Sequence, residues 1–217
     1  MWALVVNNQI KKMFRRPKAT LIGSVQHPKE IFTLWPKSKL KEHGILPYRE
    51  ENPSNFNKKY YRLNAGTTTI YRDEVVKTFT KVLKPLPQLK QVKLKGLKQH
   101  RERVINSGIV YTNTANTSGV IQTDEKSRDN IQSAYLLSTV NQWANTHTWR
   151  TRSNQKLLMD SVDLKKMATI VGKRTALCFH LHGVHEDAIK SLTSKNAVRN
   201  YDFTSSPSWP AIPVEYT

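Results

Sequence analysis

The sequence predicts an α+β protein, and three observations support this fold class. Short apolar runs separated by Asn, Gly and Pro fill the first 84 residues, which is typical of strands joined by tight turns. Apolar residues three and four positions apart dominate two later stretches, which is typical of helices. The 217 residues are 38% hydrophobic, which suffices for ordinary packed cores. We therefore expect a small β-rich N-terminal domain and a C-terminal domain of short hairpins with two helices.

Residues 1–84 form the predicted β-rich domain. Its first strand candidate, Trp2–Val6, is followed by two asparagines that favour a turn. Further along, Tyr60–Leu63 and Thr68–Tyr71 flank an Asn-Ala-Gly segment, and this arrangement predicts a hairpin.

The last strand candidate of this domain is Val75–Leu83, in which every second residue shares a face. Lys77 and Lys81 lie on that face among apolar residues. Because charged side chains on an apolar face suit a strand with an open side, we expect this strand at a sheet edge or in an interface.

A basic connector, residues 85–108, follows the β-rich domain. It contains six Lys or Arg residues against a single acid, Glu102. Leu86, Leu97 and Val104 fall on one side of a helical wheel, which favours a helix. Gly96 in its middle lowers helix propensity, and the alternation of residues 92–95 also suits a strand. We expect a helix here.

Residues 109–200 form the predicted C-terminal α+β domain. Ile109–Tyr111 and Val120–Ile121 predict two short strands, and Thr123 is the candidate N-cap of the next helix. That helix has a predicted apolar face made of Leu136, Leu137, Val140, Trp143 and Ala144.

A second hairpin, His147–Arg152 with Leu157–Met159, leads to the longest predicted helix. This helix runs from about Ser161, its candidate N-cap, to Leu192, with apolar residues at three-four spacing throughout. We expect it to form the main seam of the domain core.

The tail, residues 201–217, contains three prolines and no periodic pattern, so we expect an extended arm. Tyr201, Phe203 and Trp209 are its candidate contact residues. Two interpretations remain open: the arm docks on a neighbouring subunit, or it packs on its own domain.

The charge of the chain is high and uneven. With 35 Lys and Arg against 16 Asp and Glu, the net charge is +19. Residues 1–110 carry +16 of it and residues 111–217 carry +3. Such a surface attracts acidic proteins, nucleic acid, or anionic lipid and glycan. The candidate docking or polyanion-binding residues are Lys77, Lys81, Lys84, Lys90, Lys93, Lys95, Lys98, Arg101 and Arg103.

Nucleic acid is the less favoured of these partners. Single-stranded nucleic acid is usually bound by basic residues together with aromatic rings that stack on the bases. Phe79 is the only aromatic residue between Lys77 and Arg103. Docking on an acidic protein uses the same lysines without any base contact.

The sequence contains only weak candidates for a metal or catalytic site. Cys178, His182 and His185 share one face of the long predicted helix. Three ligands from one helix leave a zinc tetrahedron incomplete, and Cys178 also lies on the apolar seam, where a buried thiol is ordinary. We therefore expect no metal and no other cofactor. No spacing of a nucleophile, base and orienting residue is present, so we expect no enzymatic activity.

Short motifs between Gly119 and Pro210 carry a resemblance to a known family. They are Thr123–Ala134, Trp149-Arg150, Leu157–Met159, Ser161–Leu164, Ala176–Phe179 and Trp209-Pro210. This stretch resembles a domain family of unknown function that recurs in bacteriophage tail fibres and neighbouring tail proteins. The family carries no established catalytic residues, so the resemblance implies no catalytic site.

The N-terminus carries a second resemblance. The segments are Trp2–Val5, Arg16-Pro17, Gln26–Pro28 and Ile31–Trp35, and they are similar to the N-termini of small virion proteins of marine tailed phages. Related openings have fewer basic residues than Lys11–Arg16, so functions that depend on charge do not carry over.

The resemblances imply a structural component of a bacteriophage tail, such as a baseplate or tail-fibre attachment or assembly subunit. It would dock on fibre, baseplate or tail-tube subunits, form homo-oligomers, and reside in the virion tail after synthesis in the host cytoplasm. No apolar run is long enough for a membrane span. Two alternatives remain open: a tail-fibre assembly chaperone and a basic nucleic-acid-binding protein.

Overall fold

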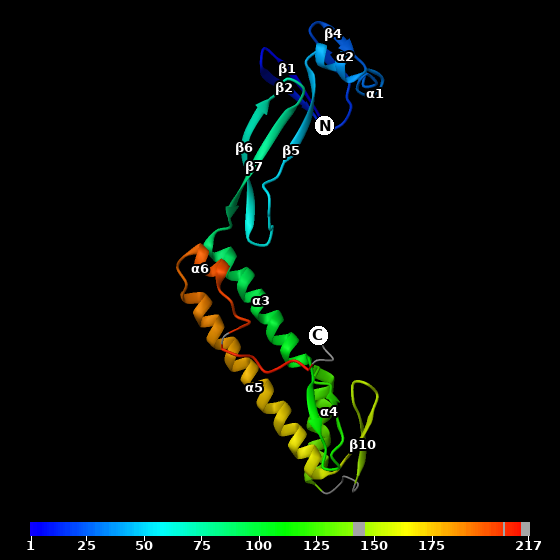
Figure 1. Cartoon of the computed structure of the whole chain (residues 1–217), viewed down its shortest axis with the longest axis vertical. Coiled ribbons are helices and arrows are strands. Elements are labelled where there is room, and N and C mark those ends of the chain that lie inside the picture. Colours follow the sequence, from blue (N-terminus) through cyan, green and yellow to red (C-terminus); the bar gives the residue numbers. More distant parts are fainter. Residues whose placement is uncertain (141–145, 206, 214–217) are drawn as a thin grey trace. The chain divides into compact units, whose positions relative to one another are not determined.

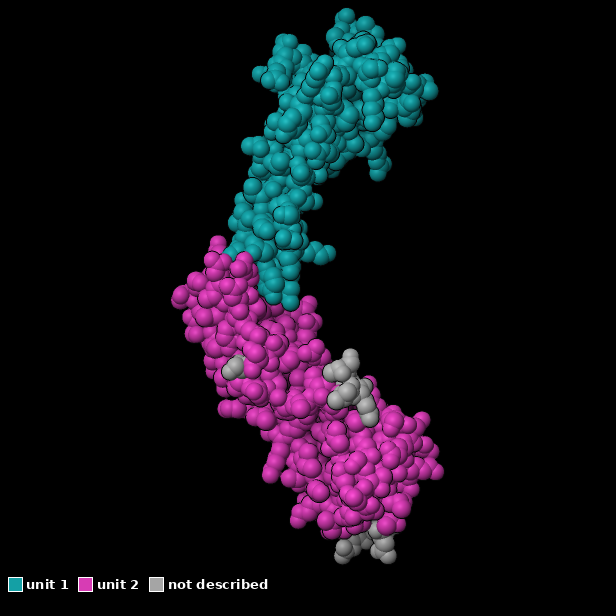
Figure 2. All heavy atoms as spheres, viewed as in Figure 1, with its two compact units in different colours: residues 1–84 teal, residues 85–217 magenta. Residues whose placement is uncertain are grey.

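The computed structural model describes residues 1–140, 146–205 and 207–213, and it shows the predicted α+β fold class (Figure 1). The chain divides into two compact units, Met1–Lys84 and Pro85–Thr217 (Figure 2). The predicted connector, residues 85–108, is therefore the start of the second unit.

The first unit is built around a five-stranded sheet with the order β2-β1-β5-β7-β6. Neighbouring strands are antiparallel except for β5 and β7, which are parallel. A small hairpin and two short helices complete the unit. The sheet strands are β1 Trp2–Val6, β2 Gln9–Phe14, β5 Ile45–Glu51, β6 Tyr61–Ile70 and β7 Val75–Leu83; the hairpin is β3 Thr20–Ile22 with β4 Val25–His27, and the helices are α1 Ile31–Leu34 and α2 Lys37–Glu42.

Strand alternation gives this sheet apolar side chains on both faces. Leu4, Phe14 and Ile45 point to one face, where Ile31 and Phe32 of α1 and Leu40 of α2 cover them. The opposite face buries a smaller cluster of Ala3, Leu46, Tyr48 and Val75. The first unit therefore has its own core.

The hairpin predicted from Tyr60–Leu63 and Thr68–Tyr71 is wrong. Residues 61–70 form one ten-residue strand, β6, which pairs with β7 along most of its length. The Asn-Ala-Gly segment forms an irregularity, because the register shifts between Ala65 and Thr68. A Cβ on Gly66 would lie 3.0 Å from the carbonyl oxygen of Thr78, so the glycine permits close approach of the two strands.

The predicted edge position of Val75–Leu83 is wrong for the first half of the strand, because Val75–Thr78 pairs with both β5 and β6. Phe79–Leu83 pairs with β6 alone, so Lys81 does lie on a stretch that is open on one side. Each of the two lysines bends over an aromatic ring. The Lys77 ammonium lies 5.2 Å from the centre of the Phe79 ring, and the Lys81 ammonium lies 5.8 Å from that of Tyr61.

The second unit combines three long helices with two short hairpins. Helix α5 packs against both α3 and α4, and α6 contacts α3. The elements are α3 Leu86–Asn106, β8 Ile109–Thr112, β9 Ser118–Ile121, α4 Glu125–Thr139, β10 His147–Arg150, β11 Lys156–Met159, α5 Ser161–Ser191 and α6 Lys195–Asn200. The helices predicted at 85–107, after Thr123 and from about Ser161 are all confirmed, as are both hairpins.

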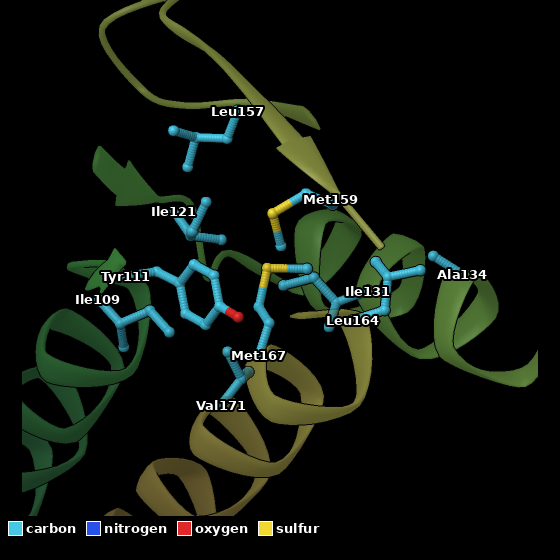
Figure 3. Close-up of a cluster of buried hydrophobic side chains, with 10 residues drawn as sticks. All are labelled: Ile109, Tyr111, Ile121, Ile131, Ala134, Leu157, Met159, Leu164, Met167 and Val171. Atoms are coloured by element: carbon cyan, nitrogen blue, oxygen red, sulfur yellow. The ribbon is translucent and has the colours of Figure 1, made fainter. Parts of the chain in front are cut away.

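The core of the second unit lies where the two hairpins meet the start of α5. Figure 3 shows the Tyr111 ring among Ile109, Ile121 and Met167, with Leu164 and Met159 beside it. The apolar seam of α5 continues along the helix through Val171 and Cys178, both buried.

Both predicted N-caps are displaced by one residue. Asp124, not Thr123, caps α4, and its carboxylate accepts from the Ser127 N–H at 3.0 Å. The Thr123 hydroxyl is engaged elsewhere, because it accepts from the Gly108 N–H at 2.9 Å. Asp160, not Ser161, caps α5 and forms a capping box with the residue three positions on.

The apolar face predicted for α4 is not the buried one. Ile131 and Ala134 are the buried residues of this helix. Leu136, Leu137 and Val140 are 53%, 44% and 60% exposed. The other two residues predicted for this face, Trp143 and Ala144, lie outside the described residues.

Candidate docking surfaces

The predicted basic residues are divided between the two units, and many of them contact other residues of their own unit. In the first unit, the Lys81 ammonium donates to the Ser54 carbonyl at 3.1 Å, Lys77 lies over a neighbouring ring, and Lys84 is half-buried. These contacts hold the ammonium groups of Lys77 and Lys81 on their own unit without neutralising their charge.

Three of the basic residues of α3 also contact groups of their own unit. Lys93 is 8% exposed and donates to the carbonyl of Tyr201 at 2.8 Å. Lys90 donates to the carbonyl of Lys190. Arg101 pairs with the neighbouring Glu102, and its guanidinium lies 4.4 Å from the centre of the Phe179 ring.

Three predicted docking residues of α3 stay exposed: Lys95, Lys98 and Arg103. Arg103 contacts the ring of His100, with 3.1 Å between its Nη2 and the histidine Nδ1. Lys95 and Lys98 lie three residues apart, so they share a helical face. The part of the predicted surface that remains available on α3 is small.

The aromatic residues of the arm pack against helices of their own unit. Tyr201 Oη lies 2.8 Å from Nδ1 of His185, and the ring of Trp209 stacks on that histidine at 5.8 Å with an interplanar angle of 10°. Phe203 lies against Gly96 of α3, where an added Cβ would come within 3.2 Å of its ring. Of the two interpretations left open for the arm, the structure shows packing on the protein's own domain.

Two histidines, His100 and His185, pack against these aromatic residues of the arm. His185 is fully buried, and His100 packs edge-on against the Trp209 ring at 4.8 Å. Burial lowers the pKa of both imidazoles below the ordinary histidine value. The Nε2 atom of each is buried without a hydrogen-bond partner among the described residues. These surroundings therefore favour the neutral form of both histidines.

The weak metal candidates are occupied by other contacts. Cys178 is buried against Val104 and Ile105 of α3, and this burial raises the pKa of its thiol. His182 faces Glu186 at 3.5 Å, and His185 contacts the arm. In the part of the chain that the structure describes, no group of three His, Cys, Asp or Glu side chains is placed to hold a metal ion.

A basic surface outside the predicted set emerges at β2, an edge strand of the first unit. Five of the eight residues Lys11–Lys18 are Lys or Arg, none is acidic, and all five are exposed. We call residues 11–18 the basic tract. Residues 12–18 line a surface hollow, and β2 pairs with β1 alone among the described strands. None of the ion pairs found between described residues involves the tract.

The signal for this surface was present in the sequence as a run of basic residues. The missing information was the position of each strand in the sheet, because β2 and β6, and not β7, are its edge strands. The structure adds that Met13, in the centre of the tract, is 48% exposed while Phe14 is buried in the core. The Phe14 ring thus anchors the tract to the core, and the neighbouring Met13 side chain is open to solvent.

Comparison with known protein families gives one match. Residues 88–205 match the family described as "Domain of unknown function (DUF4376)". The chain belongs to this family. The matched segment begins inside α3 and ends in the arm, so the family domain lies wholly within the second unit. No curated protein and no solved structure matches the chain.

Among the described residues, no helix combines the length and the apolar composition that a membrane span needs.

Proposed function

We propose that this DUF4376 protein is a structural component of a bacteriophage tail, a baseplate or tail-fibre attachment subunit that acts by docking on other tail proteins. The observation that carries the proposal is the basic tract, which begins on the edge strand β2 of the first unit's sheet and continues past the end of that strand. The resemblance of the N-terminal segments to small virion proteins supports the same assignment of the first unit.

The geometry of the tract favours a protein partner. An edge strand offers backbone N–H donors and carbonyl acceptors in alternation, and an extended peptide satisfies both kinds. Phosphate groups only accept hydrogen bonds, so nucleic acid would use the lysines and arginines but leave the carbonyls of β2 unpaired. An extended acidic segment of another tail protein matches both the edge and the charge.

The location of the protein is tested by quantitative mass spectrometry of purified, nuclease-treated phage particles, comparing isolated tails with DNA-filled heads. A fixed copy number in tails is the expected result. Absence from finished particles would instead favour a tail-fibre assembly chaperone, and recovery with the DNA would favour a nucleic-acid-binding protein.

The docking surface is tested by charge reversal within the tract. We expect the double variant R16E/K18E to reduce incorporation into particles at least about tenfold, because two attractive charges become repulsive. The matched control K58E/K59E makes the same change of net charge at exposed lysines of the same unit. Equal incorporation of both variants would show that the tract is not the docking surface.

A further inference from the structure

The long helix α5 carries an exposed apolar line on its outer side. Ile170, Leu177 and Val184 are 37%, 44% and 42% exposed, although the helix buries a separate seam through Val171 and Cys178. The three residues are spaced by seven, which is two helical turns, so they lie in one row about 10 Å apart.

The surroundings of this row are sparsely charged. Between residues 169 and 184, Lys173 is the one exposed Lys, Arg, Asp or Glu. In a chain with a net charge of +19, this is a surface where two copies meet with little repulsion.

We propose that the outer side of α5 binds the same side of a second copy of this chain, with the two helices antiparallel. A two-fold axis at Leu177 brings Ile170 of each copy opposite Val184 of the other, because both lie seven residues from the axis. Lys166 and Asp187, eleven and ten residues from the axis, then lie close to each other across the interface.

Charge selects the antiparallel arrangement. In a parallel pair, Lys166 would meet Lys166 and Lys173 would meet Lys173, which places like charges together. In the antiparallel pair, each end instead joins a lysine to an aspartate.

The inference rests on the proposed function in one respect, namely that tail parts are built from repeated copies. The two fail separately. A protein found in tails at fixed copy number but monomeric in solution would remove this inference and leave the proposed function standing.

The first test is the concentration dependence of sedimentation of the full chain. We expect a monomer–dimer equilibrium in the wild type and a dissociation constant raised at least about tenfold in Leu177→Lys, because two like charges meet at the axis. Leu136→Lys is the matched control, since it replaces an exposed leucine on α4. A wild type that stays monomeric, or a Leu177→Lys chain that dimerises as well as the control, would overturn the proposal.

The second test fixes the direction of the helices by disulfide trapping. The native Cys178 is fully buried, so the unsubstituted chain is the blank. Chains with Ile170→Cys and with Val184→Cys, distinguished by tags, should cross-link to each other when mixed under mild oxidation. Each alone should give little cross-linked dimer. Efficient cross-linking of Ile170→Cys to itself would establish a parallel pair and refute the arrangement.

Discussion

A buried carboxylate ties the β8–β9 hairpin to the start of α5, and its removal has a predictable cost. Asp163 is fully buried. Its Oδ1 accepts from the Tyr111 hydroxyl at 2.8 Å and from the Thr114 N–H at 2.9 Å, and its Oδ2 accepts from the Thr114 hydroxyl at 3.0 Å. The same side chain completes the capping box with Asp160.

The substitution Asp163→Ala removes all of these acceptors at once. The Tyr111 hydroxyl keeps the backbone carbonyl of residue 163 at 3.0 Å, but the Thr114 N–H is left without that acceptor. A hydrogen bond to a charged group contributes about 1.5–3 kcal/mol, and such contributions within one network are not additive. We therefore expect the free energy of unfolding of the second unit to fall by about 3–5 kcal/mol.

Urea unfolding followed by circular dichroism at 222 nm is the assay, because the long helices α3, α4 and α5 all belong to the second unit. Tyr111→Phe is the graded control: it removes one donor from the carboxylate and should cost about 1–2 kcal/mol. An Asp163→Ala variant within about 1 kcal/mol of the wild type would refute the hydrogen-bond network as a stabilising element.

Three further predictions concern the second unit. Burial lowers the pKa of His185, so the unfolded chain takes up more protons than the folded one as pH falls below about 6.5. The free energy of unfolding should then fall by up to about 1.4 kcal/mol per pH unit. Urea unfolding at a series of pH values should show a weaker dependence of this free energy on pH in His185→Gln. Gly96→Ala should displace Phe203 and speed hydrogen exchange in the arm, while adding up to about 1 kcal/mol of helix propensity; unchanged exchange would contradict the packing. Asp124→Ala should lower the free energy of unfolding by about 1 kcal/mol through loss of the α4 cap. Thr123→Ala should instead remove the hydrogen bond to the Gly108 N–H before β8. Equal amide hydrogen exchange at the start of α4 in the two variants would contradict the cap assignment.

The sequence predicted those elements whose local signals agree with their packing. The α5 seam from Leu164 to Ile189 is buried as the three-four spacing required. The hairpin at residues 147–159 follows from its turn residues. In both cases the period of the pattern matches the element, and no long-range contact competes with it.

The errors arose where long-range pairing overrides a local signal. The Asn-Ala-Gly segment of β6 looks like a turn, yet the paired strand β7 holds it extended. The lysines of β7 looked like an edge signal, and this holds for Lys81 alone, because Lys77 lies where β7 pairs on both sides and is accommodated over the Phe79 ring. Sheet order depends on pairings far apart in sequence, and no local pattern encodes it.

The candidate surface shows the same division. Counting charges located the basic half of the chain but not which charges are free. Lys93 donates to a carbonyl of the arm, and Arg101 lies over a ring of α5. Both partners are distant in sequence. The basic tract, by contrast, makes none of the ion pairs found between described residues, and all five of its basic residues are exposed.

The arm has a consequence for how this family's domain is delimited in practice. The family match ends at residue 205, but Trp209 and Ile212 cover Val104, Ile105 and Cys178 between α3 and α5. A recombinant fragment cut at the end of the match would uncover that apolar strip and be prone to aggregate. Expression of the isolated domain should therefore retain the chain to at least residue 213.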